Sequence, residues 1–584
     1  MLKKVLLFFA IIVNLFANEY IKKADDLQTY KKTEWLLLLH YKDGESVITD
    51  TRFFLSPNGK TNPSDELNAT ITSFYEGNGL CDFPARFDFL NKELNFKNLP
   101  KRDCKEYNEY INAIQPDSMT LIFPAGYINN PASMFGHTLI RLNKKDALKN
   151  DTTMNSFIVN YGADTGGETS GVIFAFRGVF GLYNGFFSIL PYYKMINTYN
   201  NMENRDIWEY ELNYTKNQVL YWTKHIWELQ RGNTAYYFFK ENCSYFLLET
   251  LNILHNKDLT TDFMTYTAPV DVVKVLYKEN IIYAKKFRPS LQTQIISNEK
   301  YLTDEQIKSI KKNEIIPDYL TLETEYKLLQ IKKIKGDIDD ILYRKQVFEI
   351  LKELNKNQKQ NVEIITPESQ EVGHKIAQMT IAGGKDYVFL KLRPGFNDLT
   401  DYDKGFDSQA EINFFNGEVK IFKDKFELSR FDFIKIKSLP LPTEFFSPLA
   451  FAVHLNTETR REDEVLNLDV EFGKTFGNKT FYLYGLFGGK VEYLRDSFFH
   501  KSEDAFLYGG IGDFGVMLNV FDTKTLIKYE INYFQQKEYN YNKITIENNI
   551  FINKDFYTYF EYGKSFYKEK NENDFKIGIK WSFI

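Results

Sequence analysis

The chain has 584 residues, which is too long for a single hydrophobic core, so we expect two or three domains. Its 73 basic and 78 acidic residues give a formal net charge of −5, and this acidic balance argues against a nucleic-acid-binding protein. Tyr and Phe are abundant, with 39 and 52 residues.

The first 17 residues have the parts of a secretory signal peptide. Lys3 and Lys4 supply the positive start, an apolar stretch follows, and Ala17 is a small residue suited to cleavage. The stretch is short for a membrane span, although an uncleaved anchor helix is the alternative. No later segment has about 18 consecutive apolar residues. We therefore predict an exported protein whose mature part has no membrane-spanning helix.

Residues 18–115 mix short helical and loop segments and are expected to form an accessory segment. Two of the three cysteines, Cys81 and Cys104, lie here, 23 positions apart. In an oxidising compartment two nearby cysteines are expected to pair. This predicts a Cys81–Cys104 disulfide and leaves Cys243 as a free thiol, which is either catalytic or a buried inert residue.

Residues 116–290 are predicted to form a mixed α+β domain. Three strand-like runs come first, at Met119–Phe123, His137–Leu142 and Ser156–Tyr161. Two helices follow, one over Lys216–Gln230 and one that starts near Asn242. On the first helix, His225 and Glu228 are interpreted as a surface pair rather than as metal ligands. No cofactor or metal is expected, because the sequence has no set of ligands with zinc-site spacing.

The C-terminal part changes from helical to strand periodicity. Residues 291–375 are predicted to be a helical segment with a polar linker, and residues 376–584 alternate apolar and polar side chains in about ten to twelve segments. In an exported, aromatic-rich chain this favours an outer-membrane β-barrel. A soluble β-sandwich or lipocalin-like barrel is the alternative.

Cys243 lies where a loop turns into an apolar helix. Backbone N–H groups at a helix start stabilise a thiolate, which is the attacking form of cysteine. Upstream, His137 follows a glycine on a predicted strand and is suited to act as the general base. The next strand offers Asn160 or Tyr161 to orient the second ring nitrogen of His137.

Five separated pieces of the sequence carry a family resemblance. They are Phe53-Phe-Leu-Ser-Pro-Asn-Gly-Lys60, Cys81-Asp-Phe-Pro-Ala-Arg86, Phe135-Gly-His-Thr-Leu-Ile-Arg141, Glu203-Asn-Arg-Asp-Ile-Trp-Glu-Tyr210 and Tyr237-Phe-Phe-Lys-Glu-Asn-Cys243. Over about residues 25–290 the chain resembles the Lnb family, named after bacterial lipoprotein N-acyltransferases. The order of His137 before Cys243 also resembles the permuted papain-like thiol enzymes, which include NlpC-type proteins and lecithin:retinol acyltransferase.

The resemblance implies transfer of a fatty acyl group through a thioester on Cys243, with His137 as base. The implied partners are a phospholipid donor and a lipoprotein acceptor at the outer membrane, with the catalytic domain in the periplasm. A cysteine amidase, peptidase or lipase is the runner-up, and a non-enzymatic outer-membrane binding protein is the third interpretation.

Overall fold

The computed structural model describes residues 16–583 except residues 127–133, 168–170, 264–265, 462 and 496–504. Most of the predicted signal peptide, residues 1–15, therefore lies outside the described residues. The chain divides into two compact units, Met1–Leu291 and Gln292–Ile584. Among the described residues, no helix has the length and apolar character needed to cross a bilayer.

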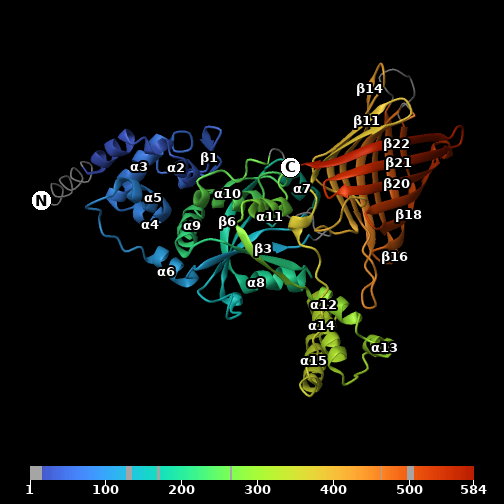
Figure 1. The fold of residues 1–584 in the computed structure, drawn as a ribbon, viewed down its shortest axis with the longest axis horizontal. Helices are drawn as coiled ribbons and strands as arrows, with labels where there is room; N and C mark the ends of the chain where they lie inside the picture. Colours follow the sequence, from blue (N-terminus) through green and yellow to red (C-terminus); the bar gives the residue numbers. More distant parts are fainter. Residues whose placement is uncertain are drawn as a thin grey trace. The chain divides into compact units, whose positions relative to one another are not determined.

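Short helices form the first part of the N-terminal unit (Figure 1). They are α2 (Thr33–Leu38), α3 (Pro63–Glu76), α4 (Gly79–Asp82), α5 (Pro84–Leu94) and α6 (Lys105–Ile114), with a small ribbon of β1 (Tyr41–Lys42) and β2 (Glu45–Ser46). Helix α3 begins after Asn62, because the Asn62 side chain accepts hydrogen bonds from the first free backbone N–H groups. A disulfide joins Cys81 in α4 to Cys104, the residue just before α6.

A buried charge network holds these helices together. Arg86 is fully buried, and its guanidinium donates to Glu66 Oε1 at 2.6 Å and to the Phe53 carbonyl at 2.9 Å. Glu228 Oε1 accepts hydrogen bonds from the backbone N–H groups of Ala85 and Arg86 at 2.6 and 3.0 Å. The network satisfies buried charges that would otherwise be costly in an apolar core.

Replacing Arg86 with methionine is expected to destabilise the N-terminal unit by about 3–5 kcal/mol, because the Glu66 carboxylate loses its counter-charge inside the core. Urea unfolding followed by tryptophan fluorescence measures the change, since Trp35 and Trp222 are buried in this unit. Arg102→Met is the matched control, because Arg102 is exposed and its loss is expected to cost less than about 1 kcal/mol. Equal losses for the two variants would contradict the assigned role of Arg86.

A seven-stranded antiparallel sheet forms the centre of the N-terminal unit, in the order β8-β6-β5-β4-β3-β7-β9. Its strands are β3 (Ser118–Pro124), β4 (Leu139–Asn143), β5 (Phe157–Ala163), β6 (Tyr183–Pro191), β7 (Ile207–Leu212), β8 (Thr234–Tyr236) and β9 (Ile282–Arg288). Alternate side chains pack on opposite faces. Ile140 and Val159 join the main core, whereas Leu139 and Ile158 pack with Tyr192 in a second cluster.

Helices cover both faces of this sheet. They are α7 (Gly171–Val179), α8 (Tyr192–Ile196), α9 (Lys216–Leu229), α10 (Cys243–His255) and α11 (Pro269–Lys278), with a π-helical turn at Asn197–Met202. Helix α10 packs against β4 and β5 and also contacts α9. Residues 243–253 of α10 are all buried, so the helix is covered on nearly every side.

The interpretation of His225 and Glu228 as a surface pair is wrong. Both side chains are fully buried, and the His225 Nε2 atom lies 2.9 Å from Nε2 of His40. The physical reason is that α9 packs between α5 and α10, so the face that carries His225 and Glu228 points into the core. Periodicity alone cannot distinguish a solvated polar face from one that meets polar partners inside.

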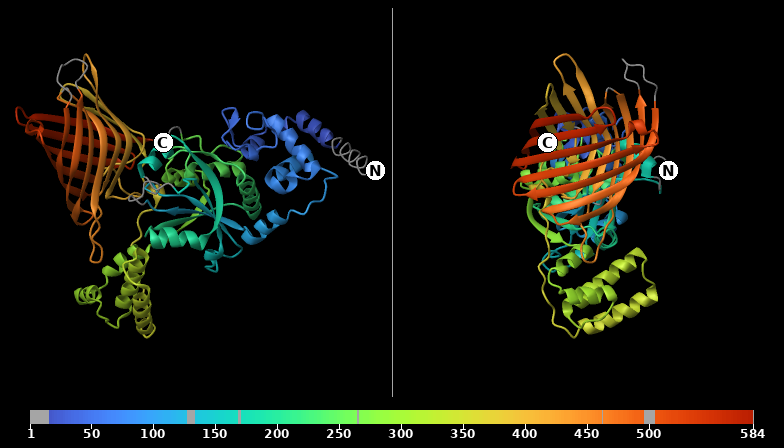
Figure 2. Two further views of the ribbon diagram at one scale, coloured as in Figure 1. Left: turned by 180° about the vertical axis from the view of Figure 1, so that it is seen from behind. Right: turned by 90° about the vertical axis from the view of Figure 1, so that its right-hand side faces the viewer.

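The C-terminal unit begins with helices and continues as a long β-sheet. The helices are α12 (Leu291–Glu299), α13 (Asp304–Lys312), α14 (Tyr319–Lys335) and α15 (Asp340–Leu354). Twelve strands then close into a barrel (Figures 1 and 2): β10 (Ala377–Gly383), β11 (Val388–Arg393), β13 (Ala410–Ile421), β14 (Phe426–Ser438), β15 (Ala450–Arg460), β16 (Asp463–Gly477), β17 (Phe481–Arg495), β18 (Ala505–Val520), β19 (Thr523–Phe534), β20 (Tyr541–Asn553), β21 (Phe556–Tyr567) and β22 (Glu572–Phe583). Closure comes from pairing of β10 with β22 and of β11 with β13, while the short β12 (Phe396–Asn397) pairs only with β13.

The barrel has apolar side chains outside and polar ones inside. Along β16, Leu466, Leu468 and Phe472 are 45%, 44% and 52% exposed, whereas Asn467 and Asp469 between them are each 4% exposed. A soluble barrel would place its apolar side chains in the interior, so this inverted pattern excludes the lipocalin-like alternative. An apolar exterior around a polar interior is typical of barrels that face lipid.

Ion pairs and one chain segment fill much of the barrel interior. Lys437 pairs with Asp513 at 2.5 Å, and Lys580 pairs with Glu547 at 2.8 Å. Residues 398–401 also enter, because the Thr400 carbonyl accepts a hydrogen bond from the buried Asn549 amide. Charged pairs and a chain segment of the protein itself therefore occupy part of the interior.

Candidate active site around Cys243

The position of His137 is set by the backbone before β4. The His137 N–H donates to the Pro124 carbonyl at 3.3 Å, and Gly136 has a φ of 91°. An added Cβ at Gly136 would lie 3.2 Å from that same carbonyl, so the position favours glycine. Strand β4 begins at Leu139, so His137 lies two residues before the strand. Arg205, almost fully buried, donates to the same Pro124 carbonyl at 3.0 Å and holds this turn.

Cys243 is the first residue of α10. Asn242 caps the helix, because its side-chain oxygen accepts hydrogen bonds from the backbone N–H groups of Ser244 and Tyr245 at 3.0 and 3.3 Å. The Asn242 amide donates to the Phe238 and Thr267 carbonyls, which ties the preceding loop to the helix start. The cap leaves the N–H of Cys243 at the positive end of the helix dipole.

Three side chains that the sequence analysis selected come together in one chain of contacts. His137 Nδ1 lies 2.9 Å from Cys243 Sγ, and His137 Nε2 lies 2.9 Å from Asn160 Oδ1. The Asn160 Oδ1 atom can only accept a hydrogen bond, so Nε2 carries the hydrogen and Nδ1 is free to take the thiol proton. The Asn160 amide in turn donates to Ser188 Oγ at 3.4 Å. The cysteine is 6% exposed, so the sulfur lies in a nearly closed site.

Tyr161, the other candidate for the orienting residue, lies on the opposite face of β5. Its ring packs 4.6 Å from the ring of Phe246 on α10, and its hydroxyl contacts Thr234. Neighbouring residues of a strand point to opposite sides, so Asn160 and Tyr161 cannot both reach His137. The structure brings Asn160 to His137 and places Tyr161 in the core.

The electrostatics favour a thiolate at Cys243. Burial raises the pKa of the thiol, but protonated His137 and hydrogen bonds from His137, Ser244 and the Thr138 backbone outweigh it, so the pKa falls from 9.0 to about 7. Burial lowers the pKa of His137, but the thiolate and the hydrogen bonds to Cys243 and Asn160 raise it above 6.5 overall. Each group therefore stabilises the charged form of the other.

Alkylation of Cys243 by iodoacetamide is expected to rise with pH with a midpoint near 7, because the reactive thiolate forms as its pKa is passed. An ordinary cysteine has its midpoint at about 8.5. In His137→Asn the midpoint should move above 8.5, because burial then acts on the thiol without a neighbouring positive charge. The rate is followed by mass spectrometry of the full chain between pH 5 and 10 (about the accessible range). A midpoint unchanged by the His137 substitution would contradict the coupling.

Three polar groups beside the thiol are not predicted by the sequence. Tyr236, at the end of β8, interacts with Cys243, and burial, then the negative charge of the Cys243 thiolate, raise its pKa well above 10. It therefore stays protonated and can donate. Thr138 Oγ1 donates to Ser244 Oγ at 3.0 Å, and Ser244 Oγ lies 3.7 Å from Cys243 Sγ. Ser244 is next to Cys243 in the sequence, but no local sequence signal marks Tyr236.

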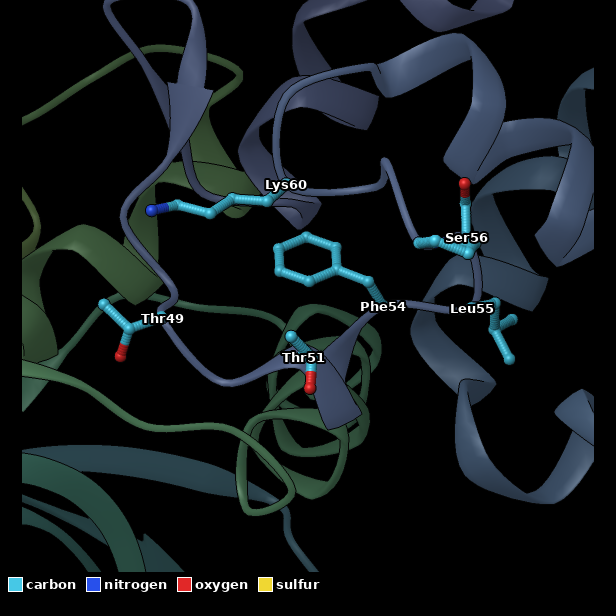
Figure 3. A pocket seen from close by; sticks show the side chains of 7 residues that line it. Thr49, Thr51, Phe54, Leu55, Ser56 and Lys60 are labelled. Atoms are coloured by element: carbon cyan, nitrogen blue, oxygen red, sulfur yellow. The ribbon is translucent and has the colours of Figure 1, made fainter.

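A separate pocket of about 380 Å³ lies on the accessory segment (Figure 3). It is lined by Thr49, Thr51, Phe54, Leu55, Ser56, Pro57 and Lys60. In Figure 3 the Phe54 ring lies between the side chains of Thr51 and Lys60. Neither Cys243 nor His137 lines this pocket, so it is not the site of the thiol chemistry.

Three segments of the chain match known family models. Residues 106–279 match the Lnb N-terminal periplasmic domain, residues 27–93 match a domain of unknown function (DUF7843), and residues 367–581 match another (DUF7840). No curated protein matches the chain.

Several solved structures are similar over the barrel. A KdgM porin is 9% identical, with a TM-score of 0.22, and the match covers 36% of this chain and 99% of the porin. The translocator domain of the autotransporter NalP from Neisseria meningitidis is 9% identical, with a TM-score of 0.20 over 36% of this chain and 87% of its own. BamA from Haemophilus ducreyi lacking POTRA domains 1–3 is 8% identical, with a TM-score of 0.20 over 35% of this chain and 42% of its own.

The family match and the barrel together give the location. The matched domain family is periplasmic, and the apolar outer surface of the barrel is suited to lipid. The protein is therefore an outer-membrane protein with a periplasmic domain. It joins a segment that matches the Lnb N-terminal periplasmic domain, residues 106–279, to a closed 12-strand β-barrel.

Proposed function

We propose that the N-terminal unit is a cysteine acyltransferase of the cell envelope. It takes a fatty acyl group from a phospholipid as a thioester on Cys243 and passes it to an amine, such as the N-terminal amine of a lipoprotein. The observation that carries the proposal is the chain of contacts from Cys243 through His137 to Asn160, with both distances at 2.9 Å. A nucleophile, a base and an orienting group in this arrangement are the requirements of thiol acyl transfer.

In the first step, Cys243 Sγ attacks the ester carbonyl of the phospholipid. His137 Nδ1 holds the proton that came from the thiol. As the tetrahedral intermediate collapses, the C–O bond breaks and His137 gives this proton to the leaving oxygen of the lysophospholipid. The product is a neutral acyl thioester and a neutral imidazole, so no other reactant is needed.

In the second step, the acceptor amine attacks the thioester carbonyl. His137 Nδ1 accepts a proton from the attacking nitrogen, the C–N bond forms, and the C–S bond breaks to release the Cys243 thiolate beside protonated His137. The pair returns to its starting state. The same base thus serves both halves of the reaction, because His137 Nδ1 lies beside the Cys243 sulfur.

Two donors are placed to stabilise the oxyanion of each intermediate. The backbone N–H of Cys243 lies at the start of α10, and the hydroxyl of Tyr236 lies against the same residue. Donors fixed before the reaction stabilise developing charge more than water does. In this proposal the domain is a permuted papain-like fold, in which the strand with the base comes before the helix with the nucleophile.

The test uses the full chain in phospholipid vesicles. Mass spectrometry should find one fatty acyl group on Cys243, labile to neutral hydroxylamine. Adding a diacylated lipopeptide with a free N-terminal amine should move that group to the amine. Free fatty acid released without use of the amine would instead indicate a cysteine hydrolase, and no acyl group on Cys243 with any donor would refute the proposal.

Asn160→Ala is expected to slow thioester formation about tenfold to a hundredfold, because His137 loses the bond that fixes its ring and tautomer. Tyr161→Phe is the matched control on the same strand and is expected to keep the wild-type rate. The rates are compared in the vesicle assay, with thermal melting to show that both variants fold. A larger loss for Tyr161→Phe would exchange the roles assigned to these two residues.

A further inference from the structure

The N-terminal unit exposes a run of large apolar side chains next to the loop that precedes Cys243. Phe176 on α7, Phe180 and Leu182 just after it, and Phe186 on β6 are 57%, 59%, 61% and 42% exposed. We call these four residues the apolar patch. The rings of Phe176 and Phe180 lie 4.7 Å apart, so the two side chains form one surface. Exposed apolar patches on folded domains mark interaction sites.

The segment that carries the apolar patch is joined to the loop that ends at Cys243. The Gly178 carbonyl accepts a hydrogen bond from the Phe238 N–H at 2.9 Å, and the Phe238 carbonyl accepts one from the Asn242 amide at 3.1 Å. An added Cβ at Gly178 would lie 2.3 Å from the Phe238 ring, so this close approach needs glycine. The contacts lead from the patch to the cap of α10, one residue before the nucleophile.

The chemistry of the segment fits a lipid layer better than a protein partner. Residues 171–186 contain a single charged residue, Arg177, and it is positive. Aromatic and leucine side chains beside a basic residue are typical of segments that lie in the interface of an anionic bilayer. The barrel already fixes the chain in a membrane, so the patch stays at high effective concentration near that surface.

We propose that the apolar patch docks the N-terminal unit on the phospholipid layer and thereby gives Cys243 access to the acyl chain of its donor. The inference rests on the proposed function for the identity of the donor, but the docking itself does not depend on catalysis. If the patch docks in this way, the acyl donor is a lipid within the layer and not a lipid delivered in solution.

The first experiment measures docking in a chain that cannot react. In a Cys243→Ser background the disulfide leaves no other thiol among the cysteines, so Phe180→Cys can be labelled with the fluorophore NBD in the full chain. In vesicles of phosphatidylethanolamine and phosphatidylglycerol, spin-labelled lipid should quench this label about twofold more than a label at Lys149→Cys, an exposed polar position. Equal quenching at the two positions would overturn the proposal. A change that needs added lipopeptide would also overturn it, in favour of acceptor docking.

The second experiment measures access to the donor. The double variant Phe176→Ser, Phe180→Ser should form the Cys243 thioester from vesicle phospholipid about tenfold more slowly, while its iodoacetamide reaction stays unchanged. Tyr193→Ser, at an exposed aromatic residue on α8, is the control. Equal thioester rates in the double variant and the wild type would overturn the proposed access. If the wild type forms no thioester but the label at position 180 is quenched, the acyltransferase proposal fails and the docking surface stands.

Discussion

Thioester formation from phospholipid is expected to be lost when Cys243 is replaced with alanine, by a factor on the order of 10³ or more. No other side chain can take over, because Cys81 and Cys104 are joined to each other and Cys243 is the free cysteine of the described chain. The sulfur is also the atom that His137 contacts directly. Mass spectrometry of the acylated protein and the rate of acyl transfer to a lipopeptide both measure the loss.

The Cys243→Ala variant should still fold, because the change removes one atom at a helix start whose cap is supplied by Asn242. Cys243→Ser, which keeps the shape of the side chain, provides the comparison, and thermal melting of both variants checks the N-terminal unit. Acyl transfer that persists in a folded Cys243→Ala protein would reject the thiol mechanism, whatever the product.

Replacing His137 with asparagine is expected to lower the rate of thioester formation by about 10²–10⁴. Two effects combine: the imidazolium no longer stabilises the thiolate, and no group returns a proton to the leaving oxygen. Raising the pH should recover part of the first loss only, since pH restores the thiolate but not the proton donor. The rate against pH for the variant and the wild type separates the two effects.

His255→Asn is a suitable control for His137→Asn. His255 is the last residue of α10, and its Nε2 atom contacts the Tyr214 hydroxyl at 2.7 Å, away from the cysteine. It should react at the wild-type rate and show the same dependence on pH. If His137→Asn behaves like this control, His137 is a structural residue and the base lies elsewhere.

The sequence predicted the features that depend on neighbouring residues. Alternation along a segment such as β16 predicted a barrel with one apolar face, and the confirmed location at the outer membrane follows from that pattern. The short distance in sequence between Cys81 and Cys104 indicated their pairing. The loop before Cys243 marked a helix start, since Asn242 is a residue type that caps helices. Each of these inferences uses interactions within a short stretch of chain.

Only the tertiary structure decided which distant residues meet. His137 and Cys243 are 106 positions apart, and their contact depends on how β4 and α10 pack. The choice of Asn160 over Tyr161 depends on which face of β5 turns toward His137 and which face packs on α10. The burial of His225 beside His40 depends on the packing of α9 between two other helices. Sequence periodicity records which side chains share a face, but the partner of that face is set by packing across the whole unit. Cys243 at a helix start could therefore be selected as a candidate from local sequence, whereas the residues around it could not.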